Sequence, residues 1–348
     1  MKHIKLLNKI IGDGNPCYFI AEIGGAFRSF EEAKRLIDSA VEIGIDAVKF
    51  QTLEAETITT KNNYFDMDAT GKILQYDVFK NFELTKELQL KIVRYAKDCN
   101  MPIFSAPSHM KDLDLLYKMD LPFYKIGSDL ACHIPLLEEI AKLGKPIILS
   151  TGMCTLDEVQ KSVEAIRDKG NDEIALLHCV SNYPSKPEES NLLAIQTMKD
   201  IMKCPVGLSD HCVGTLVSIG AASIGANLIE KHFRDARNSP SPDDIHSLTK
   251  DKFAQLMDDV RLIEQARGNG IKNPTSSERK NSTTNRVSIV SIDNISRGEI
   301  ISENKIDIRR PGIGLQPMYW KKVIGAKAKV EIKKDQPITL DMIEFQIN

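Results

Sequence analysis

The 348-residue chain is 42% hydrophobic and 27% charged, which is typical of a globular protein with one large domain and a small one, or with two ordinary domains. Its 46 Lys and Arg residues nearly balance 48 Asp and Glu residues, so the chain has no overall basic field to attract nucleic acid or an anionic membrane. No apolar run approaches the roughly 20 residues that a membrane-spanning helix needs. We therefore expect neither nucleic acid nor a membrane among its partners.

The seven cysteines are irregularly spaced, and no two of them form a CxxC pair. This spacing argues against a disulfide framework and favours reduced thiols. The apolar run at the N-terminus is too short for a signal peptide and has no small-residue cleavage site. We therefore expect a cytoplasmic protein.

Short apolar runs alternate with amphipathic stretches through most of the chain. The predicted strands are 18–24, 46–52, 101–107, 122–128, 146–152, 173–179, 205–210 and 227–233. The segments between them show helical spacing; the first opens with Ser29 and Glu32, a possible capping box. Eight strands alternating with helices predict an α/β fold of the (β/α)8 TIM-barrel type. An open doubly wound sheet is the alternative, but its GxGxxG fingerprint is absent.

The amino-acid composition of the chain changes after Gly268. Residues 271–285 are polar and rich in Asn, Ser and Thr, which indicates a linker. Residues 286–348 contain short β-like runs and a faint internal repeat, which predicts a compact β-rich module. We therefore predict a barrel domain at 1–270 and a β-rich domain at 286–348 that is small enough to need support from a partner.

Polar side chains lie at the ends of nearly all the predicted strands. They include Lys49 and Lys125 with the hydroxyls of Ser128, Ser150 and Ser209. Because active sites of TIM barrels lie at the C-terminal strand ends, we expect a functional pocket there. Two lysines beside three hydroxyls would bind a phosphate-like anion. Solvated lysines at the strand ends are the alternative reading.

His211 and His232 lie at or just past the ends of the seventh and eighth predicted strands, which are neighbours in a barrel. Two imidazoles at one rim, with a water and a substrate oxygen, would hold Mn²⁺, Fe²⁺ or Zn²⁺. Asp210 or Glu230 could support these histidines from outside the metal's own ligands. His178, at the end of the sixth strand, fits a structural role as well as a functional one.

Several motifs in chain order resemble the sialic acid (N-acetylneuraminate) synthase family, whose members make nonulosonic acids. The motifs are FIAEIG, AVKFQT, YKIGS, ILSTGM, HCVSNYP, GLSDHCVGT and IEKHF. The tail, with ISRGEIISENKIDIRRPGIGLQP and VIGAKAKVEIKKDQPI, resembles the SAF (antifreeze-like) domain of that family. The resemblance covers essentially the whole chain and implies a TIM barrel followed by a small β-clip SAF domain.

This resemblance implies a transferase that condenses phosphoenolpyruvate with an acylated amino-hexose and releases phosphate. The acceptor would be N-acetylmannosamine or a 6-deoxy diamino relative. A divalent metal is implied, most often Mn²⁺, with Mg²⁺ or Co²⁺ also possible. A domain-swapped homodimer is implied as well, in which the SAF domain of one chain closes the barrel mouth of the other.

The resemblance also assigns roles to individual residues. His211 and His232 match the metal ligands, and Glu22 matches a glutamate that would orient or deprotonate a substrate hydroxyl or water. The positions that match phosphoenolpyruvate-binding residues are Lys49, Lys125, Ser128, Ser150 and Ser209. The positions that match sugar-contacting residues are Gln51, Tyr183 and Asp243, and Arg310 matches an arginine that reaches into the partner's site.

Two departures fall on the sugar side. Gly25–Arg28 replaces a loop that usually contains Asn-His, and Asp129-Leu130 replaces a common Gly-Glu. We therefore expect the reaction type to be retained and the sugar acceptor to be unusual. The alternatives are a phosphoenolpyruvate-condensing synthase for another 3-deoxy-ulosonic acid, a degenerate non-catalytic sugar-binding homologue, and a binding or ice-interacting protein built around the SAF module.

Overall fold

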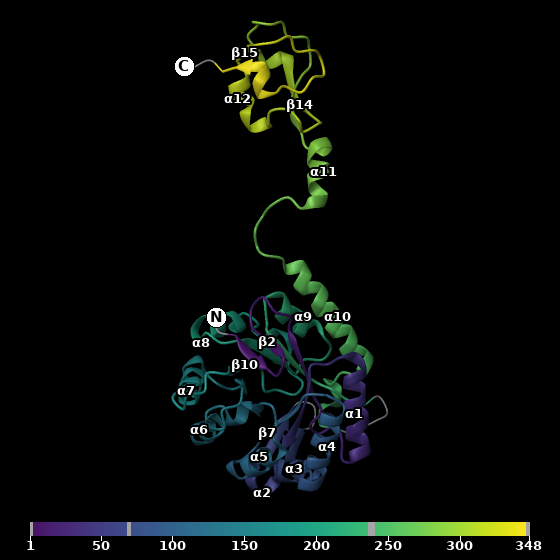
Figure 1. Ribbon diagram of the computed structural model, residues 1–348, viewed down its shortest axis with the longest axis vertical. Helices are drawn as coiled ribbons and strands as arrows, with labels where there is room; N and C mark the ends of the chain where they lie inside the picture. The colour runs from purple at the N-terminus through teal and green to yellow at the C-terminus, as the bar shows by residue number, and fades with distance from the viewer. Residues whose placement is uncertain (1–2, 68–70, 236–240, 346–348) are drawn as a thin grey trace. The chain divides into compact units, whose positions relative to one another are not determined.

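The computed structural model describes residues 3–67, 71–235 and 241–345. The chain divides into two compact units, Met1–Gly268 and Asn269–Asn348 (Figure 1). Within the described residues, none of the helices is long and apolar enough to cross a membrane.

Eight parallel strands form the central sheet of the larger unit. They are β3 (Tyr18–Glu22), β4 (Ala47–Thr52), β7 (Ile103–Pro107), β8 (Tyr124–Ile126), β9 (Ile147–Ser150), β10 (Ile174–Cys179), β11 (Val206–Asp210) and β12 (Leu228–His232). The hydrogen-bonded order is β7-β4-β3-β12-β11-β10-β9-β8, and the end strands β7 and β8 contact each other. The sheet is therefore a nearly closed barrel, which confirms the predicted TIM-barrel class.

A helix follows each strand on the outside of the barrel (Figure 1). These helices are α1 (Phe30–Ile43), α4 (Lys86–Asp98), α5 (Leu113–Met119), α6 (Ile134–Lys142), α7 (Leu156–Arg167), α8 (Ala194–Met202), α9 (Leu216–Ser223) and α10 (Lys250–Arg267). Local sequence sets their limits. In α1, Ser29 and Glu32 form the predicted capping box, and Gly44 ends the helix at a φ of 75°, where a side chain would be strained.

Side chains alternate between the barrel interior and the helical layer. On β12, Leu228 belongs to the interior apolar cluster, whereas Ile229 packs with the helices. Glu230 and His232 therefore share the inward face with Leu228, and Lys231 shares the outward face with Ile229. The same period of two decides which polar residues of the other strands can reach the barrel mouth.

The barrel interior is apolar near the strand starts and polar near the strand ends. The apolar positions are Tyr18, Ile20, Ala47, Phe104, Phe123, Ile148, Ala175, Leu177 and Leu228. Two residues further along these or neighbouring strands, the buried positions are Glu22, Lys49, Lys125, Ser150, Ser209 and Glu230. The apolar layer fills the base of the barrel, and the polar layer forms the floor of its mouth.

A hairpin that the sequence did not predict packs against the base of the barrel. It consists of β1 (Ile4–Leu6) and β2 (Lys9–Ile11). Its buried Ile4, Leu6 and Ile11 join the interior apolar cluster. The hairpin therefore covers the end of the barrel opposite the polar layer.

The long connection between β4 and α4 was also not predicted. It contains α2 (Ala55–Ile58), the antiparallel pair β5 (Tyr64–Met67) and β6 (Gly71–Leu74), and α3 (Gln75–Phe82). Because this segment follows the C-terminal end of β4, it lies at the barrel mouth. We call it the β4–α4 insertion.

The smaller unit is built from short antiparallel pairs around its own apolar core. It contains α11 (Ser276–Asn285), β13 (Ser288–Ser291), β14 (Ile306–Arg309), α12 (Trp320–Val323), β15 (Lys327–Ala328) and β16 (Ile343–Glu344). The helix α11 falls inside the segment predicted as a linker, because Thr275 and Glu278 form a capping box there. The β-rich character predicted for the C-terminal region is confirmed.

Candidate functional site

A cavity of about 590 Å³ opens at the C-terminal ends of the barrel strands. Ten of the twelve predicted site residues line it: Lys49, Gln51, Lys125, Ser128, Ser150, Tyr183, Ser209, His211, His232 and Asp243. Glu22 lies buried beside them, whereas Arg310 is an exposed residue of the smaller unit. The fold thus gathers ten predicted positions around one cavity, and their individual roles stay predictions.

Two lysines and one glutamate form the buried floor of the cavity. Glu230 Oε1 lies 3.0 Å from Lys49 Nζ and 3.4 Å from Lys125 Nζ, and it accepts a 3.1 Å hydrogen bond from Ser209 Oγ. Burial raises the pKa of Glu230, but Lys125 and Lys49 outweigh it and lower the pKa to about 2. Burial lowers the pKa of Lys49 to about 8 against the opposing effect of Glu230. An anion entering the cavity would meet two poorly solvated ammonium groups.

Glu22 ends β3 directly opposite Lys49 of β4 in the sheet register. Its carboxylate pairs with the Lys49 ammonium and accepts a hydrogen bond from the Gly24 N–H. Only 1% of Glu22 is exposed. The carboxylate is therefore held beneath the cavity, within reach of a group bound to Lys49.

Serine hydroxyls surround the two lysines. Ser128 Oγ accepts a 3.0 Å hydrogen bond from the Gly152 N–H. Ser150 Oγ and Ser181 Oγ are buried and have no hydrogen-bond partner among the described residues. A buried hydroxyl without a partner costs about 1–3 kcal/mol, so these two groups favour a ligand that supplies the missing bonds. Ser181 was not among the predicted site residues.

His211 lies just past the end of β11 and faces the cavity. Its Nδ1 is 2.9 Å from Val180 O, which fixes the ring and leaves Nε2 for another partner. The ring packs against Tyr183 with centroids 4.1 Å apart and planes tilted by 39°, and its centroid lies 5.6 Å from that of the His232 ring. The predicted pair of histidines from neighbouring strands is therefore brought to one rim.

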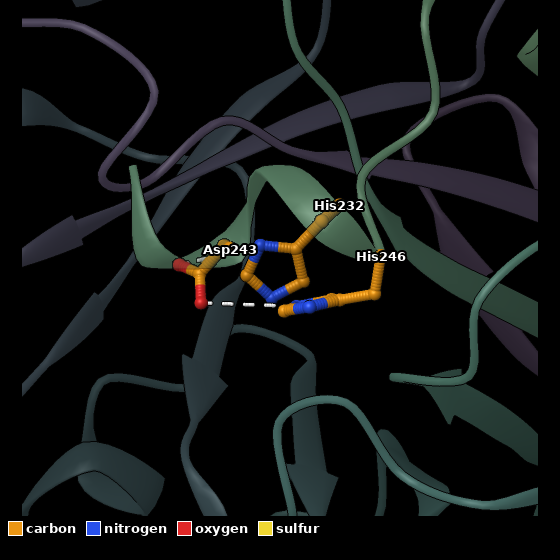
Figure 2. A group of neighbouring side chains, drawn as sticks. All are labelled: His232, Asp243 and His246. Atoms are coloured by element: carbon orange, nitrogen blue, oxygen red, sulfur yellow. Dashed lines mark ion pairs between the residues drawn. The ribbon is translucent and has the colours of Figure 1, made fainter. Parts of the chain in front are cut away.

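A further histidine, which the sequence did not single out, completes this rim. His246 follows the short 3-10 helix η4 (Pro242–Ile245), and its ring centroid lies 4.7 Å from that of His232. Asp243 reaches both rings, with Oδ2 3.7 Å from His232 Nδ1 and Oδ1 3.7 Å from His246 Nε2 (Figure 2). The donor atoms of these three residues lie within 4.8 Å of one another. Two imidazoles and a carboxylate fit a divalent first-row metal such as Mn²⁺, Fe²⁺ or Zn²⁺.

Asp210 does not join this group, although the sequence offered it as a support for the histidines. Its side chain is on the outward face of β11, where Oδ2 lies 3.0 Å from the Lys231 ammonium and accepts a hydrogen bond from Ser218. Glu230, the other candidate, binds the two lysines instead. His178 has a structural partner, since its Nε2 lies 2.7 Å from Ser190 O.

Another part of the cavity lining comes from the β4–α4 insertion and is largely apolar. Its apolar side chains are Ile58, Tyr64, Phe65, Ile73, Val78, Phe79 and Phe82, and the insertion also contributes Asp66. Phe65 and Phe79 pack edge to face with ring centroids 5.6 Å apart. Asp129, one of the departures noted in the sequence, also lines the cavity. The cavity therefore has a charged floor, a histidine rim and an aromatic wall.

Comparison with known proteins assigns this architecture to a family. Residues 36–272 match the model of the NeuB family, and residues 286–344 match the SAF domain. The N,N'-diacetyllegionaminic acid synthase of Campylobacter jejuni is 36% identical over 88% of this chain and 93% of that protein. The pseudaminic acid synthase of Helicobacter pylori is 33% identical over 90% of this chain and 93% of that protein.

A solved structure agrees with these matches. The N-acetylneuraminic acid synthetase of Leptospira borgpetersenii, in complex with citrate, is 31% identical to this chain with a TM-score of 0.72. The match covers 80% of this chain and 95% of that protein. This chain therefore belongs to the NeuB family of sialic and nonulosonic acid synthases and carries a C-terminal SAF domain.

Proposed function

We propose that this chain condenses phosphoenolpyruvate with an acylated amino-hexose to form a nonulosonic acid and release phosphate. The observation that carries the proposal is the buried cluster of Lys49, Lys125 and Glu230. It lines the same cavity as the hydroxyls of Ser150 and Ser181, which have no hydrogen-bond partner in the part of the chain that the structure describes. Two ammonium groups and free hydroxyl donors suit a small ligand that carries both a carboxylate and a phosphate. Family membership supports the same chemistry.

In this proposal Lys49, Lys125, Ser128, Ser150 and Ser209 bind the carboxylate and phosphate of phosphoenolpyruvate. C3 of phosphoenolpyruvate attacks the aldehyde carbon of the acceptor, water adds at C2, and the C2–O bond to phosphate breaks. Charge on the phosphate increases as that bond breaks, so the two fixed ammonium groups stabilise the transition state. Glu22, held against Lys49, is placed to orient or deprotonate the water or a substrate hydroxyl.

The histidine rim fits a resident divalent metal, for which we propose Mn²⁺, with Mg²⁺ or Co²⁺ as substitutes. His211 and His232 are the ligands expected from the sequence, and the structure adds His246 and Asp243 to their surroundings. A metal bound there would act as a Lewis acid on the acceptor's carbonyl oxygen. The chain's own contribution is to position that carbonyl beside the phosphoenolpyruvate pocket.

The aromatic wall supports an acceptor with apolar substituents. Seven apolar side chains of the β4–α4 insertion line this part of the cavity, and the lysines that line the cavity belong to its floor. N-acyl methyl groups and a 6-deoxy carbon would bury apolar surface against the wall, whereas a phosphate on C6 would face it without a cationic partner. We therefore propose an unphosphorylated acceptor that is related to N-acetylmannosamine but carries further apolar groups, such as a 6-deoxy diamino sugar, with Gln51, Tyr183 and Asp243 as polar contacts.

We also propose a homodimer in which Arg310 of one SAF domain enters the barrel mouth of the partner. Two observations support this proposal: Arg310 is exposed on the smaller unit, and the cavity of the larger unit opens at the barrel mouth. The reaction is proposed for the cytoplasm, in line with seven cysteines that are all unpaired.

A panel of acceptors tests this function. The purified chain is incubated with phosphoenolpyruvate, Mn²⁺ and one hexosamine at a time, and phosphate release and product mass are followed. We expect metal-dependent phosphate release with an N-acylated, unphosphorylated sugar, and less turnover with N-acetylmannosamine 6-phosphate than with N-acetylmannosamine. Turnover with arabinose or erythrose phosphate would instead identify a synthase for another 3-deoxy-ulosonic acid. Fastest turnover with plain N-acetylmannosamine would contradict the expected unusual acceptor, and no turnover with any sugar would favour a non-catalytic homologue.

A further inference from the structure

We propose that His246 is a direct ligand of the divalent metal, together with His232 and Asp243. This inference rests on the metal requirement of the proposed function. It replaces the predicted pair His211 and His232 by a site that includes residues of the connection after β12. It adds one specific residue, His246, which neither the strand pattern nor the motifs of the sequence identified.

His246 is buried without hydrogen bonds to its ring nitrogens from the described residues. The residue is 1% exposed, and neither Nδ1 nor Nε2 has a hydrogen-bond partner among the described residues. A buried polar group without a partner costs about 1–3 kcal/mol, and an imidazole carries two such atoms. An apolar residue would fill the same space without this cost. We therefore infer that Nε2, the nitrogen that faces Asp243, binds a ligand.

The side chains of His232, Asp243 and His246 also bring their donor atoms close together. His232 Nδ1 and His246 Nε2 each lie 3.7 Å from a different oxygen of Asp243. These distances are too long for hydrogen bonds. They are close to the spacing of about 3–3.5 Å that donors adopt around a first-row metal when each metal–ligand distance is about 2.0–2.2 Å. Figure 2 shows the three side chains directed toward one another.

The resulting set of ligands also suits a catalytic metal. Two imidazoles and one carboxylate leave coordination positions open for substrate oxygens, as in other two-histidine, one-carboxylate centres. His211 lies 5.9 Å from His246 by ring centroids, on the side of Tyr183 and the phosphoenolpyruvate floor. Its free Nε2 is therefore placed to approach the same metal or the substrate bound to it.

Metal binding by the full-length protein, without substrates, tests the inference apart from any activity. Mn²⁺ is titrated into apoprotein and free Mn²⁺ is followed by electron paramagnetic resonance. We expect His246→Asn and Asp243→Asn each to weaken Mn²⁺ binding by at least about 100-fold, which exceeds the 10–100-fold typical of residues that only support a ligand. His3→Ala, which removes an exposed histidine at the opposite end of the barrel, is the matched control and should bind as wild type.

A second variant gives a signature that only a direct ligand produces. His246→Cys, loaded with Co²⁺, should show a thiolate-to-cobalt charge-transfer band in the difference spectrum against wild-type protein. The wild-type reference matters because Cys179 Sγ lies 3.8 Å from His211 Nδ1 and contributes its own background. Thermal melts of the metal-free variants check that each chain folds.

The outcomes separate the two proposals. Wild-type Mn²⁺ affinity in His246→Asn, or Co²⁺ bound to His246→Cys without a new band, would overturn the inference and leave His211 and His232 as the metal ligands. Loss of Mn²⁺ binding in His246→Asn would support it even if no acceptor gave turnover, since that second failure would concern the reaction alone.

Discussion

The two halves of the barrel mouth are built in different ways. The floor, where we propose that phosphoenolpyruvate binds, consists of side chains on regular strands, such as Lys49, Lys125, Ser209 and Glu230, which hydrogen bonds of the sheet hold in fixed register. The side proposed for the acceptor consists of groups on connections between strands and helices, including Asp243, His246 and the β4–α4 insertion. This division would let the acceptor side change while the proposed donor site is kept, because loops change more easily than barrel strands.

The comparison predicts that changes to the floor stop the reaction altogether. In Lys125→Met, we expect phosphate release to fall by about 10³-fold or more, because one of two preorganised cations facing the phosphate is lost. Steady-state phosphate release measures this effect. Removing one member of a buried ion pair also costs about 3–5 kcal/mol of folding free energy, so stability must be measured beside activity.

The double variant Lys125→Met/Glu230→Gln separates the two effects. It also removes the Glu230 carboxylate, which in Lys125→Met keeps Lys49 but loses its second cation. Urea denaturation should therefore show stability closer to wild type, while activity stays as low as in Lys125→Met. Recovery of activity in the double variant would mean that Lys125 acts only through folding.

The next largest effect should come from Lys231, which follows Glu230 on β12 but lies on the outward face of that strand. Lys231 pairs with Asp210 outside the barrel and is fully buried. Lys231→Met should lower the free energy of unfolding by about 3–5 kcal/mol, since it leaves Asp210 buried without its cation. Folded protein, assayed well below its melting temperature, should keep most of its activity. Loss of activity without loss of stability would contradict the assignment of Lys231 to the structural face.

The pH dependence of phosphoenolpyruvate capture reports on Lys49. Burial holds the pKa of Lys49 at about 8, below the ordinary value of 10.5, so this side chain loses its positive charge as pH rises through about 8. We expect kcat/KM for phosphoenolpyruvate to fall by roughly 10-fold between pH 7 and pH 9, because this parameter reports groups of the free enzyme. Lys49→Arg, which stays charged, should flatten the profile at lower activity. A flat wild-type profile would show that Lys49 does not titrate in this range.

The smallest effect should come from the aromatic wall. Phe79→Ala removes part of the apolar surface proposed to contact the acyl or 6-deoxy groups of the acceptor. A loss of about 1 kcal/mol of apolar contact corresponds to roughly a 5-fold higher KM for the acceptor. The KM for phosphoenolpyruvate should not change, because Phe79 belongs to the β4–α4 insertion and not to the lysine floor. An equal rise in both KM values would contradict the division of the mouth into two halves.

The same division explains how much the sequence could predict. Strand positions repeat every two residues, so Lys49, Lys125 and Ser209 could be placed at the mouth once the eight strands were recognised. Asp210 shows the limit of this reasoning, since it adjoins His211 in sequence but points to the outer layer, where it pairs with Lys231.

His246 could not be placed from the sequence, because it follows an irregular connection in which no periodic pattern fixes the direction of a side chain. The aromatic wall was missed for a related reason, since the β4–α4 insertion has no counterpart in a plain alternation of strands and helices. In both cases tertiary packing, rather than local pattern, decides which residues reach the cavity.

The fate of the bridging oxygen of phosphoenolpyruvate tests the central claim most directly. The protein is incubated with Mn²⁺, an accepted sugar and phosphoenolpyruvate labelled with ¹⁸O at the C2–O–P bridge, and the products are analysed by mass spectrometry. Attack of water at C2 followed by C–O cleavage places the label in inorganic phosphate and gives a product with the combined carbon skeleton of both substrates. Label retained in pyruvate, without a new carbon–carbon bond, would show simple hydrolysis and contradict the proposed synthase.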